Sequence, residues 1–183
     1  MTRPRVQISA EALYFVTSNA NKLREACEAL NKDLKQYVLD LEEVQSMDEE
    51  LVALTKLRAA KKHVTEPFFV EDVSLRTDAL GGLPGPFIKY FVKRLPLKKL
   101  STLLRGPAQA VCTIAYWDGT QEHVLQGVVA GAVVAARGEG WGFSTVFEHA
   151  ELGLTFAEFS DAQRRAYTHR SVALGKLEVL LDE

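Results

Sequence analysis

The chain is organised around residues 68–91, which read Phe-Phe-Val-Glu-Asp-Val-Ser-Leu-Arg-Thr-Asp-Ala-Leu-Gly-Gly-Leu-Pro-Gly-Pro-Phe-Ile-Lys-Tyr-Phe. The apolar run at 68–70 predicts a buried strand that ends in two carboxylates, Glu71 and Asp72. Ligands of open α/β sheets bind at the ends of strands, which makes these two acids a candidate site. Taken alone, the pattern is explained equally well by two carboxylates that are merely solvated. The glycines and prolines that follow predict a shaped loop, and a short helix beginning near Pro84 or Pro86 would carry Lys89.

The composition is that of an ordinary globular protein of 183 residues, and we expect a single domain over residues 1–183. A net charge of −2 argues against a general binder of nucleic acid polymers or membrane surfaces. Cys27 and Cys112 lie far apart, which suits free thiols in a reducing compartment. Residues 1–7 lack an apolar core typical of a signal peptide, and no stretch is long enough to span a bilayer. We therefore expect a cytoplasmic protein.

A turn near the N-terminus is a candidate anion site. Residues 12–17 predict a short buried strand, and residues 19–31 predict a helix with Ser18 or Asn19 as its N-cap. A strand that passes through Thr17-Ser-Asn into a helix aims free backbone N–H groups at one point, and Lys22 lies within reach. The alternative, more common in an arbitrary protein, is that these residues only cap the helix and that Lys22 is solvated.

The remaining pattern predicts strands alternating with helices and then a hairpin, which is typical of an α/β protein with a mixed sheet. The expected elements are a strand at 37–41, a helix from a capping box at 46–49 to residue 64, a helix at 95–105 stopped by Gly106-Pro107, strands at 110–117 and 122–136 joined by a turn at Asp118-Gly119-Thr120, a glycine-rich aromatic loop at 137–143, a helix from a capping box at Ser160 to residue 167, and a helix at 171–181. Gly127 and Gly131 suggest a bend or bulge in the second hairpin strand.

Three chemical features then combine: the turn at 17–22, the carboxylates of Glu43 and Glu71-Asp72, and the basic residues Lys56, Lys89, Arg164, His169 and Arg170. Mg²⁺ prefers carboxylates together with phosphate oxygens and water. Hydrolysis of a nucleoside triphosphate requires such a metal, cations for the phosphates and a base for water. The Gly-x-x-x-x-Gly-Lys-Ser/Thr motif is missing, so this is not a P-loop protein.

Four segments in the same order and spacing resemble the inosine triphosphate pyrophosphatases: Phe-Val-Thr-Ser-Asn-Ala-Asn-Lys-Leu-Arg-Glu (15–25), Val-Glu-Asp (70–72), Leu-Gly-Gly-Leu-Pro-Gly-Pro-Phe-Ile-Lys-Tyr-Phe (80–91) and Thr-His-Arg (168–170). The resemblance implies an elongated, two-lobed α/β fold with a central mixed sheet flanked by helices, an active site in the cleft between the lobes, and a homodimer. It also implies Mg²⁺, with Mn²⁺ as a substitute. The expected reaction is attack of water on the α-phosphorus of ITP, dITP or XTP, giving the monophosphate and pyrophosphate and so removing deaminated purine nucleotides.

The resemblance also assigns roles. Asp72 matches the catalytic aspartate, a metal ligand and the base for water, and Glu71 supports it. Glu43, or else the adjacent Glu42, matches the second metal ligand. The other positions bind substrate: Thr17, Ser18, Asn19, Lys22, Lys56 and Lys89 at the phosphates, Val73 together with Asp72, and Trp141, Gly142, Phe143, Ser144, Arg164, His169 and Arg170 at the base, where the His-Arg pair reads the 6-oxo group.

Departures from the family pattern gather at the base. The family has Phe-Gly-Trp/Tyr-Asp where this chain has Trp141-Gly-Phe-Ser144, so a carboxylate is lost, and Arg164 replaces a lysine. Val73 replaces a hydroxyl residue after Asp72, and Ser18 replaces a glycine, which would cost backbone freedom at a positive φ. Two alternatives stay open: the same chemistry on a different base, and a non-catalytic nucleotide-binding relative. The retained carboxylates and lysines argue against the second.

Overall fold

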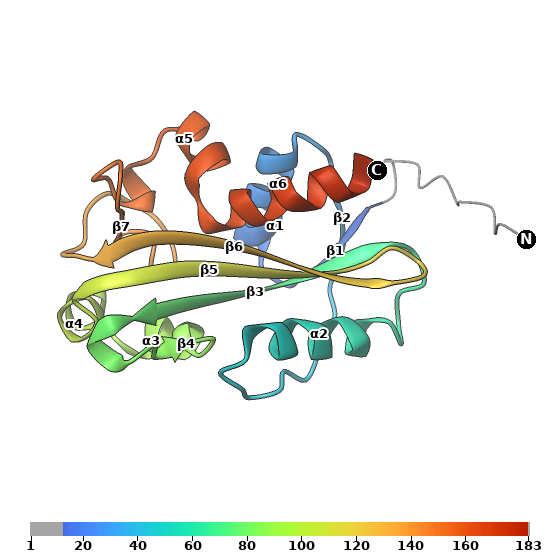
Figure 1. Ribbon diagram of the computed structural model, residues 1–183, viewed down its shortest axis with the longest axis horizontal. Helices are drawn as coiled ribbons and strands as arrows, with labels where there is room; N and C mark the ends of the chain where they lie inside the picture. Colours follow the sequence, from blue (N-terminus) through green and yellow to red (C-terminus); the bar gives the residue numbers. More distant parts are fainter. Residues whose placement is uncertain (1–12, 183) are drawn as a thin grey trace, which may run out of the picture.

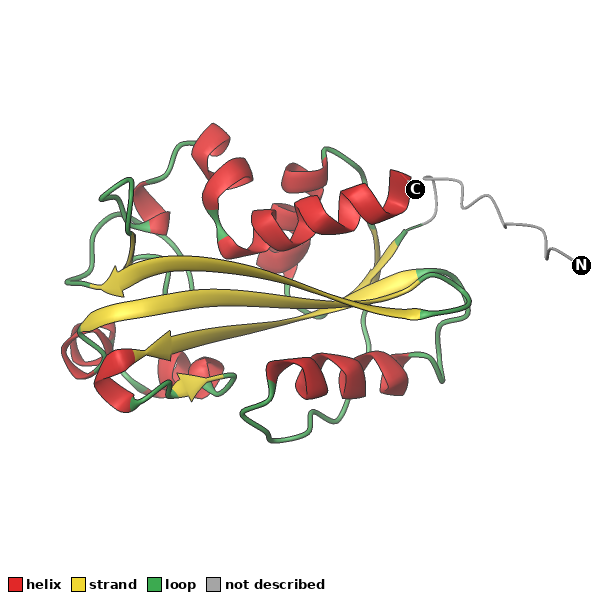
Figure 2. Ribbon diagram, in the orientation of Figure 1, coloured by secondary structure: helices red, strands yellow, loops and turns green. Residues whose placement is uncertain are grey.

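The computed structural model describes residues 13–182 and contains a long, twisted mixed sheet with helices on both faces (Figure 1). Figure 2 shows that the sheet runs through the whole elongated molecule. The strand order is β2-β1-β3-β5-β6-β7, and β4 pairs with the outer edge of β3. The predicted α/β class with a mixed sheet is therefore confirmed. The elements are β1 (Tyr14–Val16), α1 (Ala20–Leu30), β2 (Lys35–Tyr37), α2 (Glu49–Ala60), β3 (Phe68–Thr77), η2 (Asp78–Leu80), β4 (Pro84–Gly85), α3 (Ile88–Arg94), α4 (Leu97–Leu103), β5 (Gly106–Trp117), β6 (Glu122–Val133), β7 (Phe147–His149), η3 (Phe156–Glu158), α5 (Asp161–Tyr167) and α6 (His169–Asp182).

Strand β3 connects the parallel and antiparallel halves of the sheet. It pairs with the parallel strand β1 only at Phe68 and Phe69, but with the antiparallel strand β5 along its whole length. Strand β4 covers the same edge again at Leu75 and Arg76. Within the described residues, the edge of β3 from 70 to 74 therefore has no strand beside it. The prediction that the strand ends at the two carboxylates was wrong, because pairing with β5 continues the strand to Thr77.

The alternation of side chains along β3 separates its two acids. Phe69 packs with α1 and α6 on one face of the sheet, whereas Phe68 and Val70 pack against α2 on the other. Because successive side chains of a strand point to opposite faces, Glu71 follows Phe69 and Asp72 follows Val70. One carboxylate therefore lies under α1 and α6, and its neighbour faces α2.

Apolar side chains fix the helices on the sheet. Leu30 of α1 and Leu174 and Leu177 of α6 pack on one face, and Leu57 of α2 packs on the other. Full burial of each such leucine contributes about 1.5–3 kcal/mol. A third cluster joins α3 and α4 to η3 and to the loop before β7. These three clusters bring distant parts of the chain to the open edge of β3.

Several predicted boundaries near the N-terminus change. Helix α1 forms as predicted, with Asn19 as its cap, and the predicted strand at 12–17 is confirmed as β1, although Ala12 lies outside the described residues. The predicted strand at 37–41 was wrong, since β2 ends at Tyr37. The capping box at Ser46 was also wrong. Asp48 caps α2 by accepting a hydrogen bond from the Leu51 N–H at 3.0 Å, because the Glu49 carboxylate is engaged by Arg76 and Gln126.

Changes in the second half have steric causes. No bulge exists at Gly127 or Gly131, since the β5–β6 register is continuous through both residues. Instead, a Cβ at Gly127 would lie 2.1 Å from the His169 carbonyl oxygen of α6, and one at Gly131 would lie 2.1 Å from that of Glu148. Strand β5 begins at Gly106, so the Gly106-Pro107 pair that was predicted to stop a helix also starts this strand.

The remaining helices match their predictions in kind, but three of them differ in extent. Helix α3 begins at Ile88, because Pro84 and Gly85 form β4, and α4 is shorter than the predicted 95–105. Helix α6 begins at His169, two residues early, so the His-Arg pair lies in its first turn. The turn at 118–120 and the Ser160 capping box are confirmed. None of the described helices combines the length and the apolar character that a membrane span needs.

Candidate active site

A cavity of about 290 Å³ lies against the uncovered edge of β3. Its wall combines the start of α1, the loop before α2, helices α2 and α3, the loop after β6 and the start of α6. It brings together most of the predicted site residues: Asn19, Lys22, Glu43, Lys56, Asp72, Val73, Lys89, Trp141, Gly142, Phe143, Ser144, Arg164, His169 and Arg170. Thr17 and Ser18 are the two predicted substrate-binding residues that do not line it.

The turn before α1 is held by its own polar groups. The Asn19 carboxamide oxygen accepts hydrogen bonds from the backbone N–H groups of Asn21 at 3.0 Å and Lys22 at 3.3 Å. The Thr17 hydroxyl accepts from the Asn19 N–H at 3.1 Å. Asn31 is the only non-glycine residue with a positive φ in the described part of the chain, so Ser18 pays no conformational penalty for replacing a glycine.

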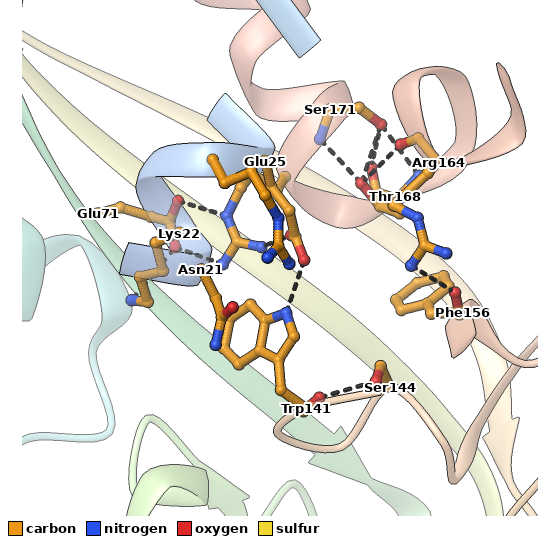
Figure 3. A network of polar contacts seen from close by, with 12 residues as sticks. Asn21, Lys22, Glu25, Glu71, Trp141, Ser144, Phe156, Arg164, Thr168 and Ser171 are labelled. Carbon is orange, nitrogen blue, oxygen red and sulfur yellow. Dashed lines mark hydrogen bonds and ion pairs between the residues drawn. The ribbon is translucent and has the colours of Figure 1, made fainter. Parts of the chain in front are cut away.

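A buried ion cluster joins β3 to α1 and α6, and its members Lys22 and Arg170 line the cavity (Figure 3). The Glu71 carboxylate accepts two hydrogen bonds from the Arg170 guanidinium, at 2.7 and 2.8 Å, and lies 3.2 Å from the Lys22 ammonium group. Burial opposes ionisation of Glu71, but Arg170 and Lys22 outweigh it and lower the pKa of this carboxyl. Burial likewise opposes the charge of Arg170, and Glu71 with Glu25 keeps the pKa of Arg170 raised. Glu71 and Arg170 therefore form a charged pair.

Asp72 lies on the opposite face, inside the cavity. Its Oδ1 is 4.0 Å from the Lys56 ammonium group, and its buried Oδ2 has no hydrogen-bond partner. Burial raises the pKa of Asp72, although Lys56 and Lys22 oppose that shift. The Lys56 ammonium also lies 2.7 Å from Glu43, which forms a second ion pair with Lys89.

Two lysines of the cavity lie in surroundings that disfavour their positive charge. Burial, followed by repulsion from Lys22, lowers the pKa of Lys56 to about 8. Burial also lowers the pKa of Lys89, with further contributions from Lys93 and Lys22. Lysine ammonium groups that gather in a concave site, with carboxylates as their only anionic partners, are suited to accept a polyanion.

Aromatic rings form the other end of the cavity. The His169 ring stacks on Phe156 with centroids 5.5 Å apart and lies 5.7 Å from Phe143. Both ring nitrogens of His169 are buried without a hydrogen-bond partner. Burial lowers the pKa of His169 to about 3, so the ring is neutral near pH 7 and offers one donor and one acceptor.

Glu25 is a cavity residue for which the sequence had indicated no role. Its carboxylate accepts a hydrogen bond from the Trp141 indole N–H at 2.8 Å and forms an ion pair with Arg170, which lies over the Trp141 ring at 5.4 Å. Glu25 therefore orients the indole (Figure 3). A usable signal was its position three residues after Lys22, which puts both side chains on one face of α1. Other cavity residues without a predicted role are Pro86, Ile88, Val92, Lys93, Phe156 and Thr168.

Ser144 and Arg164 are engaged by nearby backbone. The Ser144 hydroxyl donates to the Trp141 carbonyl at 2.7 Å and so closes the turn that carries the indole. Arg164 donates to the carbonyls of Phe156 at 3.1 Å and Phe159 at 2.9 Å. Both residues line the cavity while they shape its aromatic end.

These features define an α/β protein with a cleft that is cationic and acidic at one end and aromatic at the other. Residues 13–179 match the model of the Ham1 family, and the chain belongs to this family. It is 40% identical over 186 residues to the inosine triphosphate pyrophosphatase of Puccinia graminis f. sp. tritici, covering 93% of this chain and 96% of that one. It is 43% identical over 182 residues to that of Yarrowia lipolytica, covering 94% and 96%. The solved structure of a HAM1 protein from Coxiella burnetii superposes with a TM-score of 0.78 at 26% identity, covering 93% and 98%.

Proposed function

We propose that this protein is a nucleoside triphosphate pyrophosphohydrolase that converts ITP to the monophosphate and pyrophosphate. The observation that carries the proposal is a single cavity in which the Asp72 carboxylate, four lysines and an aromatic wall meet. The relatives at about 40% identity that carry the name inosine triphosphate pyrophosphatase support the same conclusion. The reaction is a hydrolysis of an acid anhydride.

The phosphates bind at the cationic end in this proposal. The N-terminus of α1 offers the positive end of its dipole, and Lys22 lies beside it, whereas the Asn19 side chain already accepts from the N–H groups of Asn21 and Lys22. Lys56 and Lys89, now paired with Glu43, exchange that partner for phosphate oxygens. Their charge then stabilises the negative charge that develops on the leaving pyrophosphate.

The residues present fit a magnesium ion. Asp72 and Glu43 both lie at the Lys56 ammonium group, and one buried oxygen of Asp72 lacks any partner. Among residues 13–182, no group of three or more metal-ligating side chains gathers, so the protein would supply two carboxylates and leave the other positions to phosphate and water. Mg²⁺ is bound in that way, and Mn²⁺ prefers similar ligands. Once bound, the ion would neutralise charge on the phosphate oxygens.

Asp72 is the group that we assign to activate water. Its carboxylate lies inside the cavity, and with one oxygen toward the metal the other can accept the proton of the attacking water. The oxygen of that water forms a bond to the α-phosphorus, and the bond from this phosphorus to the bridging oxygen of the pyrophosphate breaks. Glu71 contributes through Arg170 and Lys22, which it holds in place.

The base binds at the aromatic end. The neutral His169 ring can donate a hydrogen bond to the 6-oxo group of inosine, and Phe143, Phe156 and Trp141 form the surrounding apolar walls. The Arg170 guanidinium beside His169 only donates, so the amino group of adenine would find a donor there, which disfavours ATP. The same argument extends the substrates to dITP and XTP, and with them the role of removing deaminated purine nucleotides. A homodimer and a cytoplasmic location, where Cys27 and Cys112 stay as free thiols, complete the proposal.

A panel of purine and pyrimidine triphosphates tests this function through the rate of pyrophosphate release. We expect ITP, dITP and XTP to react far faster than ATP, which lacks the 6-oxo group, and the resemblance to enzymes of deaminated purine nucleotides extends this expectation to GTP. Because Ser144 supplies no carboxylate, the second candidate is the same chemistry on another base, and preference for a base without a 6-oxo group would support it. Tight binding of ITP without turnover would instead indicate a non-catalytic relative.

A further inference from the structure

Lys93 differs from the other cationic side chains that line the cavity. Within residues 13–182 its ammonium group forms no ion pair and no hydrogen bond, and the side chain is exposed at the cavity rim. Every other cation of the cavity has an acceptor: Lys22 has Glu71, Lys56 and Lys89 have Glu43, Arg170 has Glu71 and Glu25, and Arg164 has two backbone carbonyls. Lys93 therefore contributes an uncompensated positive charge.

The position of Lys93 in helix α3 makes this charge unfavourable in the empty cavity. Lys89 and Lys93 are four residues apart, so their side chains share one face of the helix, and both line the cavity. Like charges at this spacing destabilise a helix. Only Lys89 has a carboxylate beside it. An anion that enters the cavity would relieve the repulsion between the two lysines.

Further cations continue from Lys93 onto the surface of α3 and α4, which lie next to each other at one end of the sheet (Figure 1). Between Asp78 and Asp118 the chain has six basic residues and no acidic one, although its formal net charge is −2. Beyond Lys89, these residues are exposed, and none of them forms an ion pair in the part of the chain that the structure describes. We name them the cationic rim: Lys93, Arg94, Lys98, Lys99 and Arg105.

We propose that the cationic rim captures the anionic nucleotide and leads it into the cavity, with Lys93 as the member that contacts the phosphates of the bound substrate. The inference rests on the proposed function. A triphosphate is repelled by the negative net charge of the chain, and a local cationic surface beside a cleft reverses this repulsion. A nucleic acid polymer is the less favoured ligand, because Lys89 and Lys93 turn into a cavity of about 290 Å³, which suits one nucleotide.

The experiment compares Lys93→Met, the double variant Lys98→Met/Lys99→Met and the control Lys62→Met, which removes an exposed lysine beyond the end of α2. For ITP at low ionic strength we expect Lys93→Met to lower kcat/KM about tenfold with little change in kcat. The double variant should lower it about threefold, and this loss should disappear near 0.5 M salt, where surface charges are screened. Lys93→Arg should restore most of the activity, and Lys62→Met should match the wild type.

Calorimetric titration with pyrophosphate provides a readout that needs no turnover. Weaker pyrophosphate binding by Lys93→Met than by Lys62→Met supports the inference. This holds even if the wild-type protein hydrolyses no ITP, because absence of turnover would overturn only the proposed function. Wild-type kcat/KM and pyrophosphate affinity in Lys93→Met would overturn the inference. So would unchanged ITP kinetics in the double variant together with lost binding of a fluorescent single-stranded oligonucleotide, since the rim would then serve a polymer.

Discussion

The Glu71 carboxylate and the Arg170 guanidinium form a buried bidentate ion pair, with the Nε–Oε2 distance at 2.7 Å and the Nη2–Oε1 distance at 2.8 Å. It joins β3 to the first turn of α6, and Lys22 adds α1 to the same carboxylate at 3.2 Å. These three elements supply the catalytic aspartate, the His-Arg pair and the phosphate-binding turn of the proposed enzyme. The pair therefore fixes the relative positions of the two ends of the cavity.

Glu71→Gln should destabilise the protein strongly. Glutamine keeps the shape of the side chain, but it leaves Arg170 with Glu25 as its remaining carboxylate and removes the carboxylate that pairs with Lys22. Loss of one partner from a buried pair costs about 3–5 kcal/mol of unfolding free energy, measured by denaturant titration. The control is Glu122→Gln in the partly exposed pairs with Arg58 and Lys61, which should cost about 0–1 kcal/mol. Equal effects of both variants would show that the buried pair has no special role.

Gly127→Ala tests the close contact between β6 and α6. The added Cβ would lie 2.1 Å from the His169 carbonyl oxygen and 2.5 Å from the Ala173 nitrogen, and neither backbone atom can move without shifting α6. We expect a loss of about 1–3 kcal/mol of stability, as for other overpacked sites, and a raised KM for ITP because His169 moves. Gly175→Ala in α6, which meets nothing within 4 Å, is the matched control and should stabilise the helix by up to about 1 kcal/mol. A harmless Gly127→Ala would contradict this packing.

The sequence predicted the element types and most of the cavity, because hydrophobic periodicity and helix caps are local signals. It missed the continuation of β3 past Asp72, since that depends on pairing with β5 some forty residues later. The sequence suggested a bend or bulge at Gly127, whereas a glycine is needed there because helix α6 packs closely across the strand. The same limit applies to Glu25, because nothing near it in the sequence shows that Trp141 and Arg170 converge on its carboxylate.

The buried His169 predicts a loss of stability in acid. Burial lowers the pKa of His169 from its ordinary value of about 6.5 to about 3 in the folded protein. The unfolded chain binds this proton as the pH falls below about 6.5 and the folded chain does not, so the stabilisation is complete above that pH and is lost towards pH 3. From pH 7 to pH 5 this residue should cost about 2 kcal/mol. His169→Gln should remove that part of the pH dependence, and an unchanged slope would contradict a neutral His169.

Glu43→Gln should weaken the proposed magnesium site. The variant loses one of two carboxylates, so we expect the apparent affinity for Mg²⁺ during ITP hydrolysis to fall by about tenfold or more. Glu42→Gln is the control, since Glu42 does not line the cavity whereas Glu43 does. Removal of divalent cations with a chelator should stop turnover by the wild type. A larger effect of Glu42→Gln would assign the metal to that neighbour.

The central claim, attack of water on the α-phosphorus with Asp72 as the base, is tested most directly by hydrolysis of ITP in ¹⁸O-labelled water. The account predicts one labelled oxygen in the inosine monophosphate, unlabelled pyrophosphate, and a rate lowered by about 10³-fold or more in a folded Asp72→Asn variant. Label in the pyrophosphate, release of orthophosphate, or an Asp72→Asn variant with wild-type turnover would contradict it.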